Sequence, residues 1–172
     1  GVLGVASIGL SSLKNDALVE IVKTNTAENY PLHASCKLTW EFPTTSCEMV
    51  GASLLSAAES MGVTEVGWED SCGEGQLCGY TLSSDDTLKL SGTHTTPVKH
   101  YVDDIKFELI PSGKNSCSVH GNSRSKTFYA YLDASTNYCN LSNLGTTTGY
   151  SYTENTNDNI CTQYSIRNCD KY

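Results

Sequence analysis

The stretch that decides the fold runs from Tyr101 to Leu144 and reads YVDDIKFELIPSGKNSCSVHGNSRSKTFYAYLDASTNYCNLSNL. Its first ten residues predict a half-buried β-strand, because polar side chains separate the apolar Ile105, Phe107 and Leu109. A Pro-Ser-Gly turn follows at 111–113. The segments 116–120 and 127–132 predict two further strands, separated by a Gly-Asn-Ser-Arg break, before a short segment anchored by a cysteine. The stretch therefore predicts adjacent strands, and it contains no catalytic motif.

The residues before this stretch predict a helix that covers the sheet. Residues 36–42 alternate as a strand, and the segment after Pro43 has the signals of a helix. Thr45 is the expected N-cap, Glu48 completes a capping box, and Gly62 is expected just after the last turn. An apolar stripe should face the sheet. The predicted fold class is α+β: an antiparallel sheet of five to seven strands with one principal helix packed on one face, stapled by disulfides.

Three regions follow from the changes in composition along the chain. Residues 1–15 form an apolar N-terminal segment, 16–144 form the core domain, and 145–172 form a Thr/Asn/Tyr-rich tail strapped by cysteines. Within the core domain, residues 16–23 predict another strand, although their apolar pairs also fit the period of a short helix. Residues 80–82 and 87–95 predict a hairpin through a turn at 83–86.

Part of the core domain resembles a known family. The run DASTNYCNLSNL from Asp133 to Leu144, preceded by a Tyr-x-Asp-Asp-x-x-Phe strand and by Trp40-Glu41-Phe42, resembles a family of small secreted, cysteine-containing proteins predicted from the genomes of ciliates and other microbial eukaryotes. This resemblance spans residues 36 to 144. An uncharacterised bacterial and plastid domain is similar in the order of its residues: Val102 to Phe107, then Ser123 to Ser125, then Leu132, Asp133 and Asn137. Neither family has an established activity, so the resemblance implies a fold and a compartment.

Charge and cysteine content restrict the location and the partners. The 172 residues carry 11 Lys and Arg against 19 Asp and Glu, a net charge of -8, with no basic stripe. This argues against a nucleic-acid partner, which needs clustered positive charge. No stretch approaches the roughly 20 apolar residues of a membrane span. The first residue is glycine rather than methionine, as expected if a signal peptide has been removed, although an arbitrarily chosen chain start would look the same.

The eight cysteines predict an oxidised disulfide framework and a secreted, extracellular protein, because their spacing does not match metal sites. Proximity in sequence predicts the pairs Cys72 with Cys78 and Cys161 with Cys169. Three pairings stay open for the remaining four, which are Cys36, Cys47, Cys117 and Cys139.

The residues whose side chains could bind a metal or act in catalysis do not show the spacing of a known metal or catalytic motif. His94, His100 and His120, with Asp103 or Asp104, have ligand-type side chains, but their spacing is unspecific, and the interpretation is that the protein holds no metal and no cofactor. Residues 155–159 alternate like a calcium loop but lack its turn glycine and distal glutamate. No G-x-S-x-G elbow is present, and the even cysteine count leaves no free nucleophile. Asn140 begins the N-glycosylation sequence Asn-Leu-Ser, expected on an exposed edge.

The apolar N-terminal segment GVLGVASIGLSSL suggests two roles: it forms a strand of its own sheet, or it adds a strand to a neighbouring subunit. The second role makes subunit contacts of Val2, Leu3, Val5, Ile8 and Leu10. The functional hypothesis is a secreted, non-enzymatic structural protein that self-associates into an extracellular fibre, coat or matrix. The alternatives are a secreted module that binds a small molecule or lipid between helix and sheet, and then a secreted hydrolase.

Overall fold

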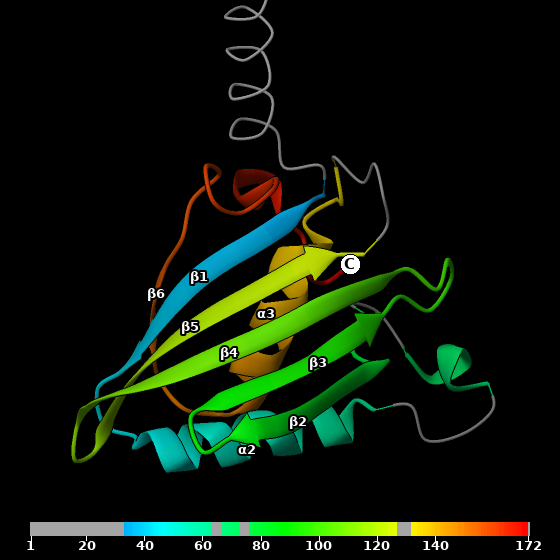
Figure 1. Cartoon of the computed structure of the whole chain (residues 1–172). Coiled ribbons are helices and arrows are strands. Elements are labelled where there is room, and N and C mark those ends of the chain that lie inside the picture. The colour runs from blue at the N-terminus through cyan, green and yellow to red at the C-terminus, as the bar shows by residue number, and fades with distance from the viewer. Residues whose placement is uncertain (1–32, 63–66, 73–75, 127–131, 172) are drawn as a thin grey trace, which may run out of the picture. The chain divides into compact units, whose positions relative to one another are not determined.

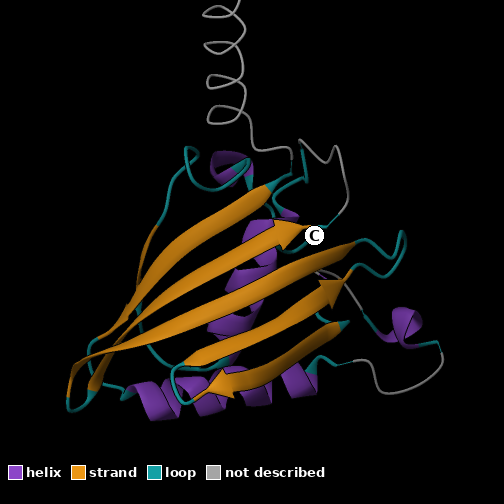
Figure 2. Ribbon diagram, in the orientation of Figure 1, coloured by secondary structure: helices purple, strands orange, loops and turns teal. Residues whose placement is uncertain are grey.

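The computed structural model describes residues 33–62, 67–72, 76–126 and 132–171. The elements in chain order are β1 (Ser35–Phe42), α2 (Cys47–Ser60), η1 (Trp68–Ser71), β2 (Tyr80–Asp86), β3 (Lys89–Thr95), β4 (Val102–Gly113), β5 (Ser116–Ser125), α3 (Thr136–Thr147), β6 (Thr153–Asn155) and η3 (Tyr164–Ile166). The strands form one antiparallel sheet in the order β2-β3-β4-β5-β1-β6. Both α-helices lie against the same face of it (Figure 1; Figure 2). The predicted α+β class is confirmed.

The N-terminal predictions cannot be placed on this structure. The strand expected at 16–23 and the subunit contacts expected of Val2, Leu3, Val5, Ile8 and Leu10 lie outside the described residues.

Strand β1 comes first among the described strands in the chain, but in the sheet it lies between β5 and the short edge strand β6. It pairs with β5 along its whole length, from Ser35 opposite Arg124 to Phe42 opposite Cys117. On its other edge, residues 39–41 pair with the three residues of β6. Alternation explains the burial, because the even-numbered residues of β1 are buried against the helices and the odd-numbered ones face outward.

The predicted break after His120 is wrong, because β5 continues through it as one strand to Ser125. Glycine is required at 121 by close packing, not by a turn: a Cβ there would lie 2.8 Å from the Leu38 side chain and 3.2 Å from that of Phe107. Two other turns are also displaced. Strand β4 continues to Gly113, and the β2–β3 turn lies at 87–88.

Helix α2 is confirmed, with its cap shifted by one residue. Ser46, not Thr45, is the N-cap, and its side chain accepts a hydrogen bond from the Met49 backbone N–H. Thr45 is buried instead. At the other end, the backbone N–H of Met61 closes the last turn, one residue before Gly62. The buried positions of α2 form the expected stripe: Cys47, Val50, Gly51, Leu54, Ala57 and Ala58.

Helix α3 was not predicted. Its sequence, TNYCNLSNLGTT, is rich in residues of low helix propensity, and the N-cap Ser135 makes no capping bond with its side chain. Most of the helix is nevertheless buried, including Asn137, Asn140 and Asn143. Tertiary contacts therefore stabilise α3, since its local sequence does not.

The structure contains four disulfides, three of which join elements that are distant in the sequence. The predicted Cys72–Cys78 pair is confirmed, but the predicted Cys161–Cys169 pair is wrong. The tail runs back beside β1, which places Cys161 opposite Cys36, and then reaches α3. The observed bridges are Cys36–Cys161, Cys47–Cys117, Cys72–Cys78 and Cys139–Cys169.

Trp40 shows how the tail completes the core. Its ring is fully buried and stacks on Phe107 at a centroid distance of 5.7 Å. From the tail, Tyr152 packs at 5.1 Å, and the Trp40 Nε1–H donates to Glu154 at 2.9 Å. From α3, Gly145 lies so close that a Cβ would come within 2.8 Å of the indole. The expected tail, 145–172, therefore supplies part of the interior around Trp40.

Candidate functional site

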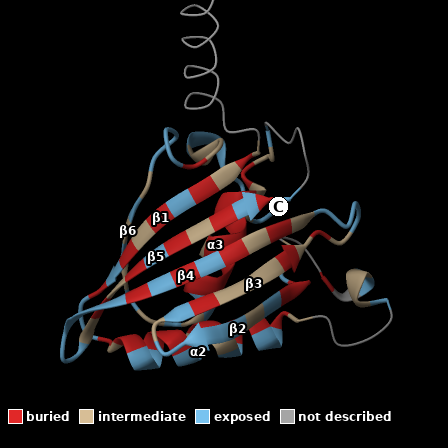
Figure 3. Ribbon diagram, viewed as in Figure 1, coloured by how far each residue is buried: buried red, intermediate tan, exposed pale blue. Residues whose placement is uncertain are grey.

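The two faces of the sheet differ in what covers them. One face carries the apolar core and the two helices, whereas the other is uncovered by any described element (Figure 1). Figure 3 shows the result as alternating buried and exposed residues along the strands. The side chains on the uncovered face are almost all polar, with Val102 and Ile110 as the apolar exceptions among the strand residues. We call this the open face.

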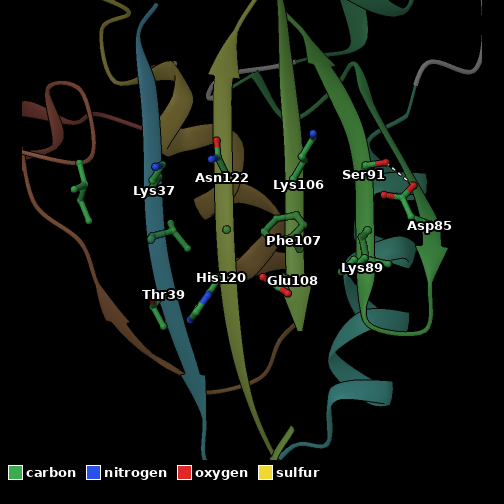
Figure 4. A pocket seen from close by; sticks show the side chains of 14 residues that line it. Lys37, Thr39, Asp85, Lys89, Ser91, Lys106, Phe107, Glu108, His120 and Asn122 are labelled. Atoms are coloured by element: carbon green, nitrogen blue, oxygen red, sulfur yellow. Dashed lines mark hydrogen bonds between the residues drawn. The ribbon is translucent and has the colours of Figure 1, made fainter. Parts of the chain in front are cut away.

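A hollow of about 670 Å³ lies on the open face, over β3, β4, β5 and β1. We call it the groove; Figure 4 shows the side chains that line it. Its volume is within the ~300–1,000 Å³ range of small-molecule sites. The polar side chains that dominate its lining are Lys37, Thr39, Lys106, Glu108, His120 and Asn122.

Strand register places these side chains in two rows across the sheet. In the first row, Asn122 of β5 pairs with Lys37 of β1 on one side and with Lys106 of β4 on the other. Neighbouring strands are ~4.8 Å apart, so the two lysine backbones are roughly 10 Å from each other. Ser91 of β3 extends the row beyond Lys106 and donates to Asp85 at 2.6 Å. The first row thus has one ammonium group on each side of an amide group.

The second row lies two residues along the strands, ~7 Å from the first. His120 of β5 pairs with Thr39 of β1 and with Glu108 of β4, and Glu108 pairs in turn with Lys89 of β3. In Figure 4 the side chains of both rows stand on the same side of the strands. The second row combines an imidazole, a carboxylate and an ammonium group.

The charges in the groove are not matched to each other. Within the described ranges, the side chains of Lys37, Lys106 and Glu108 make no hydrogen bond or ion pair. By contrast, just beyond the groove the Lys126 ammonium lies 2.9 Å from the Asp104 carboxylate. Unpaired charges facing a hollow are available to a ligand.

A disulfide fixes one wall of the groove. Ile160 lines the groove on the β1 side, and its carbonyl accepts a hydrogen bond from the Lys37 backbone N–H at 2.8 Å. The next residue, Cys161, is bonded to Cys36 in β1. The wall is therefore held covalently beside Lys37.

A second polar cluster lies inside the protein, between the sheet and α3; we call it the inner network. Asp103 is 3% exposed and accepts hydrogen bonds from Ser125 and from Asn140, each at 2.8 Å. Burial raises the pKa of Asp103, and these two hydrogen bonds oppose the shift. Asn137 accepts from Ser123 at 2.7 Å and also lies within donor distance of Ser125. Because its members are buried, we interpret the network as structural.

The expected exposure of Asn140 is wrong. Its side chain is 1% exposed, and its Nδ2 atom, to which a glycan would be attached, donates to Asp103 and Ser123. A glycan at this nitrogen would replace one of its two hydrogens, so at least one of these hydrogen bonds would be lost. The Asn-Leu-Ser sequence lies within helix α3.

The other candidate residues are not brought together. His94 is buried on the inner face, His120 lies in the groove, and His100 lies in a loop with its Nε2 atom 3.3 Å from Glu69. Within the described ranges, no group of three or more His, Cys, Asp or Glu residues has an arrangement that could hold a metal ion. At the expected calcium loop, the Asn157 side chain accepts from the Asn159 backbone N–H, as in a turn.

His94 is expected to make stability depend on pH. Burial lowers its pKa from 6.5 to about 4, although hydrogen bonding to the backbone of Gln76 and Cys78 opposes this shift. The unfolded chain therefore binds a proton that the folded protein excludes. The free energy of unfolding should fall by roughly 3 kcal/mol as the pH is lowered from 6.5 to 4.

The variant His94→Phe keeps a ring against Tyr80 and should lose this fall, whereas the exposed control His120→Gln should keep it. Asp103, opposite His94 on β4, has a raised pKa and so acts with the opposite sign; both variants retain it. Urea unfolding followed by tryptophan fluorescence at pH 4 to 7 measures the difference. An unchanged pH profile in His94→Phe would refute the assignment.

Comparison of the chain with protein-family models, with curated protein sequences and with solved structures finds no match. The resemblance to secreted microbial proteins therefore stays a prediction. The fold and the groove define the class of molecule on their own: a disulfide-bonded α+β domain with one open, polar sheet face.

Proposed function

We propose that this protein is a secreted, non-enzymatic binding module that holds a small polar ligand in the groove on its open face. The observation that carries the proposal is the groove itself, a hollow over the middle of the sheet lined by charged side chains that are not paired with each other.

Four disulfides, with no free cysteine, support an extracellular location. In the described part of the chain, no helix is long and apolar enough to cross a membrane. The polar lining favours a polar ligand over a lipid. Between helices and sheet, where a lipid was expected, the side chains form one buried cluster that includes Trp40 and Phe107.

Amide chemical shifts test the proposal. Isotope-labelled protein is mixed with sets of small sugars, amino acids, carboxylic acids and polyamines. At least one set should shift the amide signals of β1, β4 and β5 around the groove. The variant Asn122→Trp fills the groove and should abolish these shifts, whereas Ser118→Trp, on the same strand and face but outside the lining, should keep them. Shifts confined to other surfaces, or no shifts with any set, would refute the proposal.

A different observation supports the structural hypothesis as a second candidate. Apart from a bridge between Gly62 and Tyr80, no described strand pairs with the outer edge of β2. An open strand edge can accept a strand from another chain. If the N-terminal segment is that strand, protein lacking residues 1–15 should stay folded and lose self-association in light scattering. If the protein that contains residues 1–172 is monomeric at all concentrations, this role is excluded.

A further inference from the structure

We infer that the groove ligand is a small organic anion, held by Lys37 and Lys106 on either side of Asn122. This inference rests on the proposed function, since it names the chemistry of the same site. It requires that the anionic group, a carboxylate, sulfate or phosphate, lies over the first row of the groove.

The distribution of charge supports an anion. The whole protein has a net charge of -8, yet three of its eleven lysines and arginines line this one hollow: Lys37, Lys89 and Lys106. Two of them flank Asn122 directly in the strand register. Lysines placed two strands apart on one face repel each other weakly, and an anion between them removes that repulsion.

Hydrogen-bonding geometry supports the same position. The Asn122 side chain lies between the lysines and makes no hydrogen bond to the other described residues. Its amide group can donate to an anionic oxygen while each ammonium group makes a charge-assisted hydrogen bond. Lysine is suited to this role because its long side chain can adjust to a bound charge.

The acidic side chains limit the size and the shape of the anion. The acidic side chains of the groove are Glu108 in the second row and Asp85, which accepts a hydrogen bond from Ser91 at the β3 end of the first row. A polyanion laid across the whole hollow would meet these carboxylates. The ligand should therefore keep its negative charge over the first row, between Lys37 and Lys106, and direct hydroxyl or amino groups toward Glu108 and His120.

The groove also lacks the surface expected for a neutral sugar. Apart from His120, the strand positions that point outward around it carry no aromatic ring, and Phe107 faces the core. Stacking on a ring is therefore restricted to one imidazole. Charge and hydrogen bonds must supply most of the binding, which favours an anion.

Three probes with four-carbon chains test the inference: succinate, succinamide and 1,4-diaminobutane. Succinate should shift the amide signals of Lys37, Lys106 and Asn122, and its binding should weaken as NaCl is raised. The double variant Lys37→Gln/Lys106→Gln should bind succinate roughly tenfold more weakly. The matched control Lys99→Gln/Lys114→Gln removes the same charge from exposed positions outside the lining and should bind like the wild type.

The outcomes separate this inference from the proposed function. Binding of succinamide or 1,4-diaminobutane in the groove, without binding of succinate, would overturn the anion inference and leave the binding module standing. Equal loss of succinate binding in both double variants would also overturn it, since the effect would then come from net charge alone. Inorganic phosphate and sulfate, titrated in parallel, show whether the anionic group suffices. If none of these probes shifts the groove signals, the anion inference fails, and the proposed function also fails if none of the sets of sugars, amino acids, carboxylic acids and polyamines shifts them.

Discussion

Replacing Asn137 with leucine is expected to lower the free energy of unfolding by about 3 kcal/mol. Asn137 is fully buried, and it is the member of the inner network with the most partners. It accepts from Ser123, and its amide nitrogen lies within donor distance of Ser125, Asp133 and the Ala34 carbonyl. Leucine has a similar size but no polar atoms, so these buried partners lose hydrogen bonds. Thermal unfolding should occur roughly 6–12 °C lower.

The matched control is Asn122→Leu, the same change on the opposite face of the sheet. Asn122 makes no hydrogen bond within the described part, so its replacement should change the unfolding free energy by no more than ~0.5 kcal/mol. Equal effects of the two substitutions would show that the inner network does not stabilise α3 against the sheet.

Removing the Cys36–Cys161 disulfide is expected to cost the most of the four bridges. The bridge spans 125 residues, and restricting so long a loop in the unfolded chain contributes about 5 kcal/mol. The variant Cys36→Ala/Cys161→Ala should show this loss in urea unfolding. It should also weaken ligand binding in the groove, because Ile160 is no longer held beside Lys37.

The matched control is Cys72→Ala/Cys78→Ala, which removes a bridge that spans 6 residues and should cost about 2 kcal/mol. Both pairs of cysteines are buried, so the loss of side-chain volume is similar. If the short bridge costs as much as the long one, then the bridges act through the folded protein and not through the unfolded chain.

Local sequence patterns predicted the helix and the strands whose formation depends on neighbouring residues in the chain. Alternation identified β1 and most of β4, and the capping signals placed α2 to within one residue. Helix α3 has no such signal, since its asparagines act through partners on other elements, such as Ser123 and Asp103. These contacts join residues of different elements, so no local sequence pattern predicts them. For the same reason, Asn140 was expected at the surface.

The sequence did not predict the groove, because its lining residues come from different strands. Lys106 and Glu108 were recognised as the polar positions of a half-buried strand, which is where alternation puts solvent-facing residues. Their partners Lys37, Asn122 and His120 come from β1 and β5, and only the register of the sheet shows that they are neighbours. The prediction of one disulfide was wrong for the same reason. Closeness in sequence predicted Cys161–Cys169, but the path of the tail along β1 pairs Cys161 with Cys36 and Cys169 with Cys139.

The place of β1 between β5 and β6 has a consequence for biosynthesis. A ribosome produces β1 before any other described strand, but the strands that pair with it emerge last among those of the sheet. At about 5–20 residues per second, Cys36 waits roughly 6–25 s for Cys161 to be made. Until β5 has been made, the nascent β1, with Trp40 on its apolar face, has neither native neighbour strand available. The protein can therefore complete its sheet only near the end of its own translation, and until then the apolar face of β1 lacks its native cover.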